Sequence, residues 1–127
     1  MYKGTNPDVD SYSAFFDNIR TSTRSGSTGL DATLADAGVR TVVISGVARD
    51  FCVGFTALDA LSLGLTTFVV EDLIRGITDE GIDEWRGKII VGGGVMVSTA
   101  RQMAADSARW GYNRAAYYSG GASSSCK

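Results

Sequence analysis

The sequence predicts an α/β protein with a three-layer α-β-α arrangement and a mainly parallel sheet. Two observations support this fold class. Apolar runs rich in β-branched residues, at 40–47 and 65–72, alternate with segments of helical periodicity. Two of these helical segments end in a glycine, Gly38 and Gly64, where a short connection to the next strand can begin. This alternation is typical of βαβ units, in which helices cover a parallel sheet.

The individual elements follow from local patterns. Leu30, Leu34 and Ala37 form one apolar stripe and predict a helix that ends at Gly38. The run "RTVVISGV" is continuously apolar, so we expect a strand covered on both faces. The remaining predicted elements are a helix at 52–64, a strand at 65–72, a short acidic helix at 78–87, a short strand at 92–98 and a helix at 99–110.

The two ends of the chain lack a lasting period. Residues 1–29 contain turn formers and an aromatic group, Tyr12, Phe15 and Phe16, which indicates a long loop that docks onto something. Residues from about 111 to 127 are expected to be an irregular tail. A chain of 127 residues suits a single domain, so 1–127 is predicted to be one unit.

Composition excludes several functions. Twelve basic and fourteen acidic residues show no basic stripe, which argues against nucleic-acid and anionic-membrane partners. No apolar run is long enough to cross a bilayer, and a cytoplasmic location is expected. The chain has no histidine, so it cannot form a Ser-His-Asp triad, a Cys-His pair or a histidine-ligated metal site. Its two cysteines, Cys52 and Cys126, do not resemble a disulfide framework.

Cys52 follows the carboxyl end of a predicted strand, where parallel α/β sheets bind ligands. If a helix begins near Asp50 or Phe51, its first turn favours a thiolate and offers free N–H groups to an oxyanion. Periodicity alone nevertheless favours a packing role, because free cysteine is among the most buried residue types. Taken alone, Lys3 is most simply a solvated charge near a terminus, Arg49 a surface charge and Asp50 a helix N-cap.

Two segments change this interpretation. "YKGTNPDVDSYSAFFDN" and "GVARDFCVGFTALDALSLGLTTFVVEDLIRGI" resemble the nicotinamidase/pyrazinamidase group of the isochorismatase-like cysteine hydrolases, which have a Rossmann-like fold. Both segments occur in the family's order, and together with a weaker continuation they cover more than half of the chain. With this resemblance, Cys52 is predicted to be a nucleophile.

The resemblance also implies roles for individual residues. Cys52 matches the family's nucleophile, and Lys3 matches the lysine beside it in the catalytic triad. The bond between Val47 and Ala48 matches a non-proline cis peptide. The N–H groups of Ala48 and Cys52 match the oxyanion hole, and Tyr12 falls in the loop that lines the substrate pocket.

The implied reaction is hydrolysis of a small-molecule amide, nicotinamide, to nicotinate and ammonia through a cysteine thioester, as in NAD salvage. In the family, an aspartate and the Asp and His metal ligands precede the lysine, and no counterpart to them occurs here. The chain is therefore interpreted as N-terminally truncated and is expected to bind no metal. Complete members are expected to carry a divalent metal, Zn, Fe or Mn. Weak or no turnover is expected from this chain alone.

A second function remains open. The chain is alternatively a non-catalytic isochorismatase-like module that binds a small molecule or a protein partner, with an exposed sheet edge paired to another chain. A homo-oligomer also remains open. A nucleotide-binding interpretation is weak, because "GGGVMVS" lacks the spacing of a phosphate loop.

Overall fold

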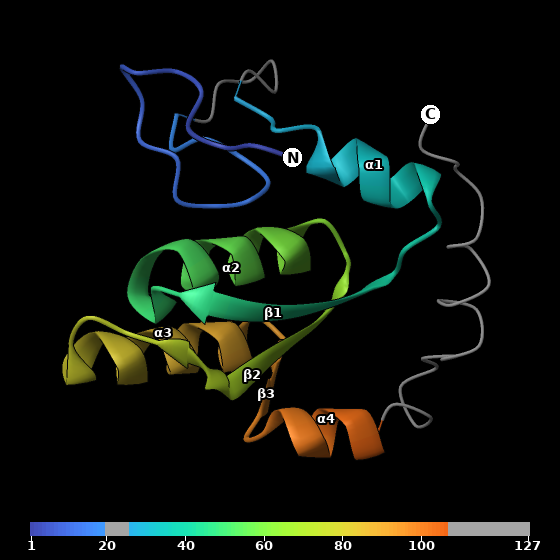
Figure 1. Ribbon diagram of the computed structural model, residues 1–127, viewed down its shortest axis with the longest axis vertical. Helices are drawn as coiled ribbons and strands as arrows, with labels where there is room; N and C mark the ends of the chain where they lie inside the picture. The colour runs from blue at the N-terminus through green and yellow to red at the C-terminus, as the bar shows by residue number, and fades with distance from the viewer. Residues whose placement is uncertain (20–25, 107–127) are drawn as a thin grey trace, which may run out of the picture.

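The computed structural model describes residues 1–19 and 26–106, and within them helices and strands alternate along the chain (Figure 1). The elements are α1 (Leu30–Asp36), β1 (Thr41–Val47), η1 (Arg49–Val53), α2 (Gly54–Ser62), β2 (Thr66–Arg75), α3 (Asp79–Val91), β3 (Val95–Val97) and α4 (Ala100–Ala105). η1 is a π-helical turn that runs directly into α2. The predicted tail, residues 111–127, and the end of the predicted helix 99–110 lie outside the described residues.

The three strands form one parallel sheet in the order β1-β2-β3. Ile44 of β1 is in register with Val69 of β2, and Val69 is in register with Met96 of β3. Because side chains alternate between the two faces of a strand, these three side chains share one face of the sheet. The predicted α/β fold with a parallel sheet is confirmed.

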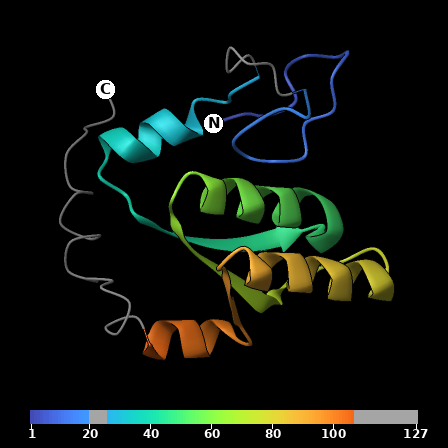
Figure 2. The same ribbon diagram turned by 180° about the vertical axis from the view of Figure 1, so that it is seen from behind.

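The core lies between this face of the sheet and the helical layer formed by α2 and α3. Its buried members are Val53, Ala57, Val69, Ile74 and Ile89, with Ile44 and Met96 packed against them. α2 and α3 contact each other, whereas α4 contacts only β2 and β3 among the described elements. Both views show the strands between α2 and α4 (Figures 1 and 2). The core thus packs η1 against the sheet and against α3.

β1 differs from the expectation of a strand covered on both faces. Val43 is 52% exposed and Val47 is 71% exposed. The physical reason is that both side chains lie on the face opposite Ile44, and the described helices that contact β1, η1 and α2, pack on the Ile44 face. A continuous apolar run does not show whether one face of a strand or both are covered.

α3 is longer than predicted, since it continues past Gly87 to Val91. Ile89, in this extension, is fully buried in the core, and this burial outweighs the poor helix propensity of glycine. Within the described part of the chain, no helix has the length and apolar character to span a membrane.

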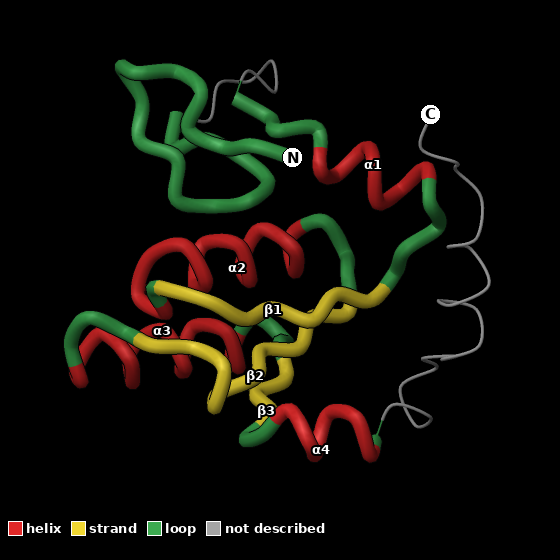
Figure 3. Tube along the Cα trace, in the orientation of Figure 1, coloured by secondary structure: helices red, strands yellow, loops and turns green. Residues whose placement is uncertain are grey.

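Residues 1–19 contain no helix or strand, and Figure 3 shows them as a loop that lies above α2. The backbone N–H of Ala14 donates to the Thr56 hydroxyl of α2 at 2.9 Å. Phe15 is buried, and an isolated bridge joins Phe16 to Ser27. The segment is therefore docked onto α2 by specific contacts despite its lack of regular structure.

Gly54, at the junction of η1 and α2, gives a test of this packing. A Cβ there would overlap the Trp85 ring of α3 and stand 2.6 Å from the carbonyl oxygen of Arg49. We expect Gly54→Ala to lower the free energy of unfolding by about 1–3 kcal/mol, the usual cost of overpacking. Gly87→Ala is the matched control, because nothing lies within 4 Å of its added Cβ. Helix propensity should make the control more stable by about 1 kcal/mol. Urea unfolding measures both, and equal effects of the two variants would contradict the close packing at Gly54.

Candidate active site

The Lys3 side chain meets the Cys52 sulfur. Lys3 Nζ lies 3.2 Å from Cys52 Sγ, 2.8 Å from the Ser11 carbonyl oxygen and 2.7 Å from the Tyr12 carbonyl oxygen. An ammonium group has three donors, and these three acceptors satisfy all of them. The two carbonyls therefore hold the ammonium beside the sulfur, although Lys3 itself is exposed.

Cys52 is the fourth residue of η1 and lies at the carboxyl end of β1, where the chain turns into the helices. It is a half-buried free thiol. The Thr56 hydroxyl donates to the Cys52 carbonyl oxygen and accepts from the Ala14 N–H. One hydroxyl thus links the helix that carries the sulfur to the segment that carries Lys3.

The turn before Cys52 contains a cis peptide bond between Val47 and Ala48. The Ala48 carbonyl oxygen accepts the N–H of Phe51 at 3.2 Å and the N–H of Val53 at 3.0 Å. Ala48 is therefore fixed at the entrance to η1. The role of Ala48 and Cys52 as an oxyanion hole stays a prediction.

Tyr12 lies among aromatic side chains of the Cys52 helix. Its ring centroid is 5.3 Å from that of Phe51, edge to face, and 5.4 Å from that of Phe55. The Tyr12 hydroxyl lies 3.4 Å from an Asp10 carboxylate oxygen. Phe51 and Phe55 were not identified from the sequence, although their four-residue spacing around Cys52 puts them on one helical face.

Arg49 and Asp50 are not the surface charge and N-cap that the sequence suggested. Each is only 8% exposed. The Asp50 carboxylate accepts the N–H groups of Ile77 and Thr78, which precede α3, and η1 already begins at Arg49. Arg49 Nη2 lies 4.0 Å from a Glu71 carboxylate oxygen. These partners are more than twenty residues away along the chain, so no local pattern could have indicated them.

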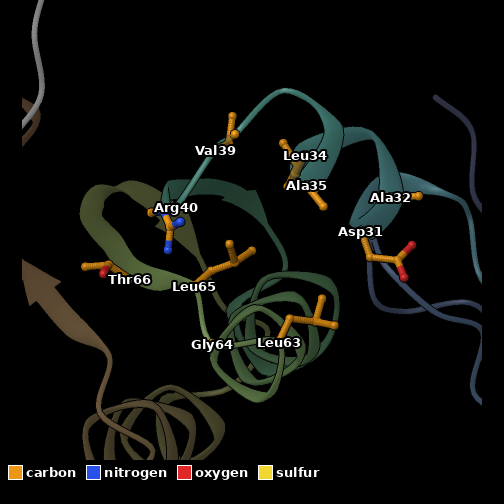
Figure 4. A pocket seen from close by; sticks show the side chains of 11 residues that line it. Asp31, Ala32, Leu34, Ala35, Val39, Arg40, Leu63, Gly64, Leu65 and Thr66 are labelled. Carbon is orange, nitrogen blue, oxygen red and sulfur yellow. The ribbon is translucent and has the colours of Figure 1, made fainter.

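A hollow of about 610 Å³ lies elsewhere, between α1 and the connection from α2 to β2. Figure 4 shows Leu34 and Ala35 of α1 on one side of it and Leu63 and Leu65 on the other. None of the predicted site residues lines this hollow. Its volume therefore does not mark the active site, and we locate the site by the chemistry around Cys52.

A parallel α/β sheet with a lysine–cysteine pair at the carboxyl end of a strand defines the class of this protein. Residues 8–102 match the family model of the isochorismatase domain, and this range is more than half of the chain. The chain therefore belongs to the isochorismatase domain family, as the resemblance predicted. Tyr12 and Cys52 lie within the matched range, and Lys3 lies before it.

The relatives within this family are nicotinamidases. The chain is 49% identical over 77 residues to the nicotinamidase of Escherichia coli strain K12, with 61% of this chain and 34% of the relative covered. It is 37% identical over 101 residues to the nicotinamidase of Acinetobacter baylyi, with 80% and 45% covered. The chain thus spans less than half the length of these relatives.

The solved structures that are similar to this chain include a nicotinamidase and a pyrazinamidase. PnC1 from L. infantum, in complex with nicotinate, has a TM-score of 0.68 and 37% identity, with 76% of this chain and 46% of that chain covered. Yeast nicotinamidase bound to the inhibitor nicotinaldehyde has a TM-score of 0.69 and 30% identity, with 76% and 44% covered. The pyrazinamidase of Pyrococcus horikoshii in complex with zinc has a TM-score of 0.65 and 33% identity, with 76% and 48% covered.

The zinc in the Pyrococcus protein indicates that members of this family bind a divalent metal, but the described residues of this chain do not offer a matching set of ligands. Within residues 1–19 and 26–106, no three His, Cys, Asp or Glu side chains cluster closely enough to hold a metal ion. The full sequence also lacks histidine. No step of the chemistry below is therefore assigned to a metal.

Substitution of Lys3 tests the lysine–cysteine contact. The Lys3 ammonium is a cation 3.2 Å from the sulfur, and iodoacetamide alkylates the thiolate form of cysteine. We expect Lys3→Gln to slow alkylation of Cys52 about two- to five-fold, since exposed ion pairs contribute about 0.2–1 kcal/mol. Lys3→Arg keeps the charge and should retain most of the rate. Peptide-level mass spectrometry follows Cys52, with Cys126 as the internal reference. Equal rates in the wild type and both variants would show that the contact has no chemical effect.

Proposed function

We propose that this chain carries the nucleophile and part of the substrate pocket of a nicotinamide-type amidohydrolase. Cys52 is the nucleophile and Lys3 is its cationic partner. The observation that carries the proposal is the 3.2 Å contact between Lys3 Nζ and Cys52 Sγ at the carboxyl end of β1. The nicotinamidase relatives support the choice of substrate.

The reaction proceeds in two stages. The Cys52 thiolate attacks the carboxamide carbon, and the carbonyl oxygen becomes an oxyanion. The C–N bond then breaks, its nitrogen takes a proton and leaves as ammonia, and a thioester remains on the sulfur. Water attacks the thioester and loses both of its protons, the C–S bond breaks, and nicotinate and the thiolate are released. One of these protons replaces the proton taken up by ammonia, and the other passes to solvent.

We assign the oxyanion hole to the N–H groups of Ala48 and Cys52. Cys52 is among the first four residues of η1, whose N–H groups have no acceptor one turn earlier in a helix. Ala48 immediately precedes η1 and is held by the two hydrogen bonds to its carbonyl oxygen. Donors fixed before the substrate arrives stabilise a developing oxyanion without reorganisation.

Aromatic side chains line the pocket in this proposal. Tyr12 and Phe51 meet edge to face beside Cys52, and Phe51 is 38% exposed. An exposed aromatic ring beside the nucleophile suits a planar aromatic amide, because stacked or edge-on rings attract each other. Tyr12 thus acts as a lining residue together with Phe51.

The proposed site lacks an evident group for proton transfer among the described residues. The Lys3 ammonium contacts two carbonyl oxygens and the sulfur, and none of these partners is a carboxylate. The proton for ammonia must therefore come from Lys3 or from water. Unless a carboxylate from outside the described residues reaches Lys3, both stages lose the gain of about 10²–10⁴ that general acid–base catalysis typically provides.

A second candidate is a non-catalytic module that binds a small molecule or a protein partner. The exposed apolar side chains of β1, Val43 and Val47, favour it, because an end strand offers unpaired backbone groups to another chain. Such a module does not require a reactive Cys52. The reactivity of the thiol therefore separates the two functions.

We expect Cys52 to react with iodoacetamide at neutral pH about two- to five-fold faster than Cys126, because Lys3 Nζ lies 3.2 Å from Cys52 Sγ, whereas Cys126 stands in the polar sequence "SSSCK". Mass spectrometry of the labelled peptides gives both rates in one sample. Unfolding in urea should remove the difference, since it separates Lys3 from the sulfur. Equal, slow labelling of both cysteines in the folded chain favours the non-catalytic module.

Nicotinaldehyde tests the nucleophile by itself, because an aldehyde has no leaving group that must be protonated. Its carbonyl carbon accepts the thiolate to form a hemithioacetal, so we expect it to protect Cys52, and not Cys126, from alkylation. Ammonia release from nicotinamide by the same chain should be weak or equal to that of Cys52→Ala. Absence of protection at Cys52 argues against a substrate pocket. Rapid, Cys52-dependent ammonia release would show that no further carboxylate is needed.

A further inference from the structure

Asp50 and Cys52 lie two positions apart in η1 and contact different parts of the molecule. Cys52 meets Lys3 of the N-terminal segment. Asp50 instead meets the connection between β2 and α3, where both of its carboxylate oxygens lie 3.1 Å from the Ile77 nitrogen. The same carboxylate lies 3.4 Å from the Thr78 nitrogen. η1 is thus anchored on one side and presents the sulfur on another.

The site around the Asp50 carboxylate is closely packed. Asp50 is 8% exposed, and a Cβ at Gly81 would stand 3.0 Å from a carboxylate oxygen and 3.1 Å from the Asp50 Cβ. Only glycine therefore leaves room for the carboxylate at this position. The carboxylate also lies at the amino end of the 13-residue helix α3, where the helix dipole favours a negative charge.

The neighbouring charge gives a weaker anchor. Arg49 Nη2 is 4.0 Å from Glu71, and the buried Arg49 Nε has no hydrogen-bond partner among the described residues. Glu71 itself accepts from Arg86 Nε at the shorter distance of 3.0 Å. The side-chain hydrogen bonds from the first turn of η1 to α3 and its connection therefore come from Asp50.

We propose that Asp50 is a positioning residue that holds Cys52 Sγ within reach of Lys3 Nζ. The inference rests on the proposed function, in which this pair prepares the nucleophile. The Ser11 and Tyr12 carbonyls hold the Lys3 ammonium, so its distance from the sulfur depends on where the backbone of η1 places Cys52. When the Asp50 carboxylate is lost, η1 is free to shift relative to α3, and the sulfur moves away from the ammonium.

A double-mutant cycle tests this positioning role. In the wild-type chain, Lys3→Gln should slow alkylation of Cys52 two- to five-fold. In the Asp50→Ala background, the same Lys3 substitution should change the rate by a factor close to one. The measured quantity is called the Lys3 ratio. It is the Cys52 labelling rate of a chain that has Lys3, divided by the rate of the same chain with Lys3→Gln, each normalised to the labelling rate of Cys126.

Further variants keep the test valid if Asp50→Ala does not fold. Gly81→Ala retains the aspartate but crowds its carboxylate, so it should also reduce the Lys3 ratio. Asp50→Asn retains one acceptor oxygen and should give an intermediate ratio. Val97→Ala is the control for general destabilisation, because β3 makes no contact with η1. It should retain the full ratio of the wild type.

The outcomes separate the two proposals. A Lys3 ratio that persists in Asp50→Ala and Gly81→Ala overturns the positioning role and leaves the proposed function intact. A ratio of one in the wild-type chain contradicts both proposals, because there is then no effective pair to position. An equal loss of the ratio in Val97→Ala would show that general destabilisation explains the effect, which also overturns the positioning role.

Discussion

A carboxylate removed from water needs hydrogen-bond donors in its place, and this constraint shapes the molecule around Asp50. The N–H groups of Ile77 and Thr78 supply the donors. The end of β1, the turn η1 and the start of α3 are thereby held at fixed positions relative to one another. The core reinforces this arrangement, since Val53 of η1 and Ile89 of α3 belong to the same buried cluster.

The N-terminal segment depends on this framework. It contributes Lys3 and Tyr12, yet it has no helix or strand of its own among residues 1–19. Its position is set by hydrogen bonds such as that from Ala14 to Thr56, and by burial of Phe15. The site is therefore assembled from two parts of the chain that are about fifty residues apart, and its geometry is only as firm as this docking.

The order of helices and strands could be predicted because hydrophobic periodicity and glycine stops are local signals. Features that depend on residues far away along the chain could not be predicted from such local signals. The exposure of Val43 follows from the lack of a described helix on its face of β1, and the burial of Asp50 is matched by donors 27 and 28 residues later. The pairing of Lys3 with Cys52 was predicted from the family resemblance. The local sequence alone indicates a solvated charge at Lys3 and a packing role for Cys52.

The aromatic contacts give the site an optical reporter. Tyr12 contacts Phe55, whose ring centroid is 4.8 Å from that of Trp85, and the Lys88 ammonium lies 4.6 Å above the Trp85 ring. Indole emission responds to the polarity and charge around the ring. Once Trp110 is replaced by phenylalanine, the fluorescence of Trp85 reports how the N-terminal segment sits on α2. Movements near the nucleophile can then be followed in solution without any label on the sulfur.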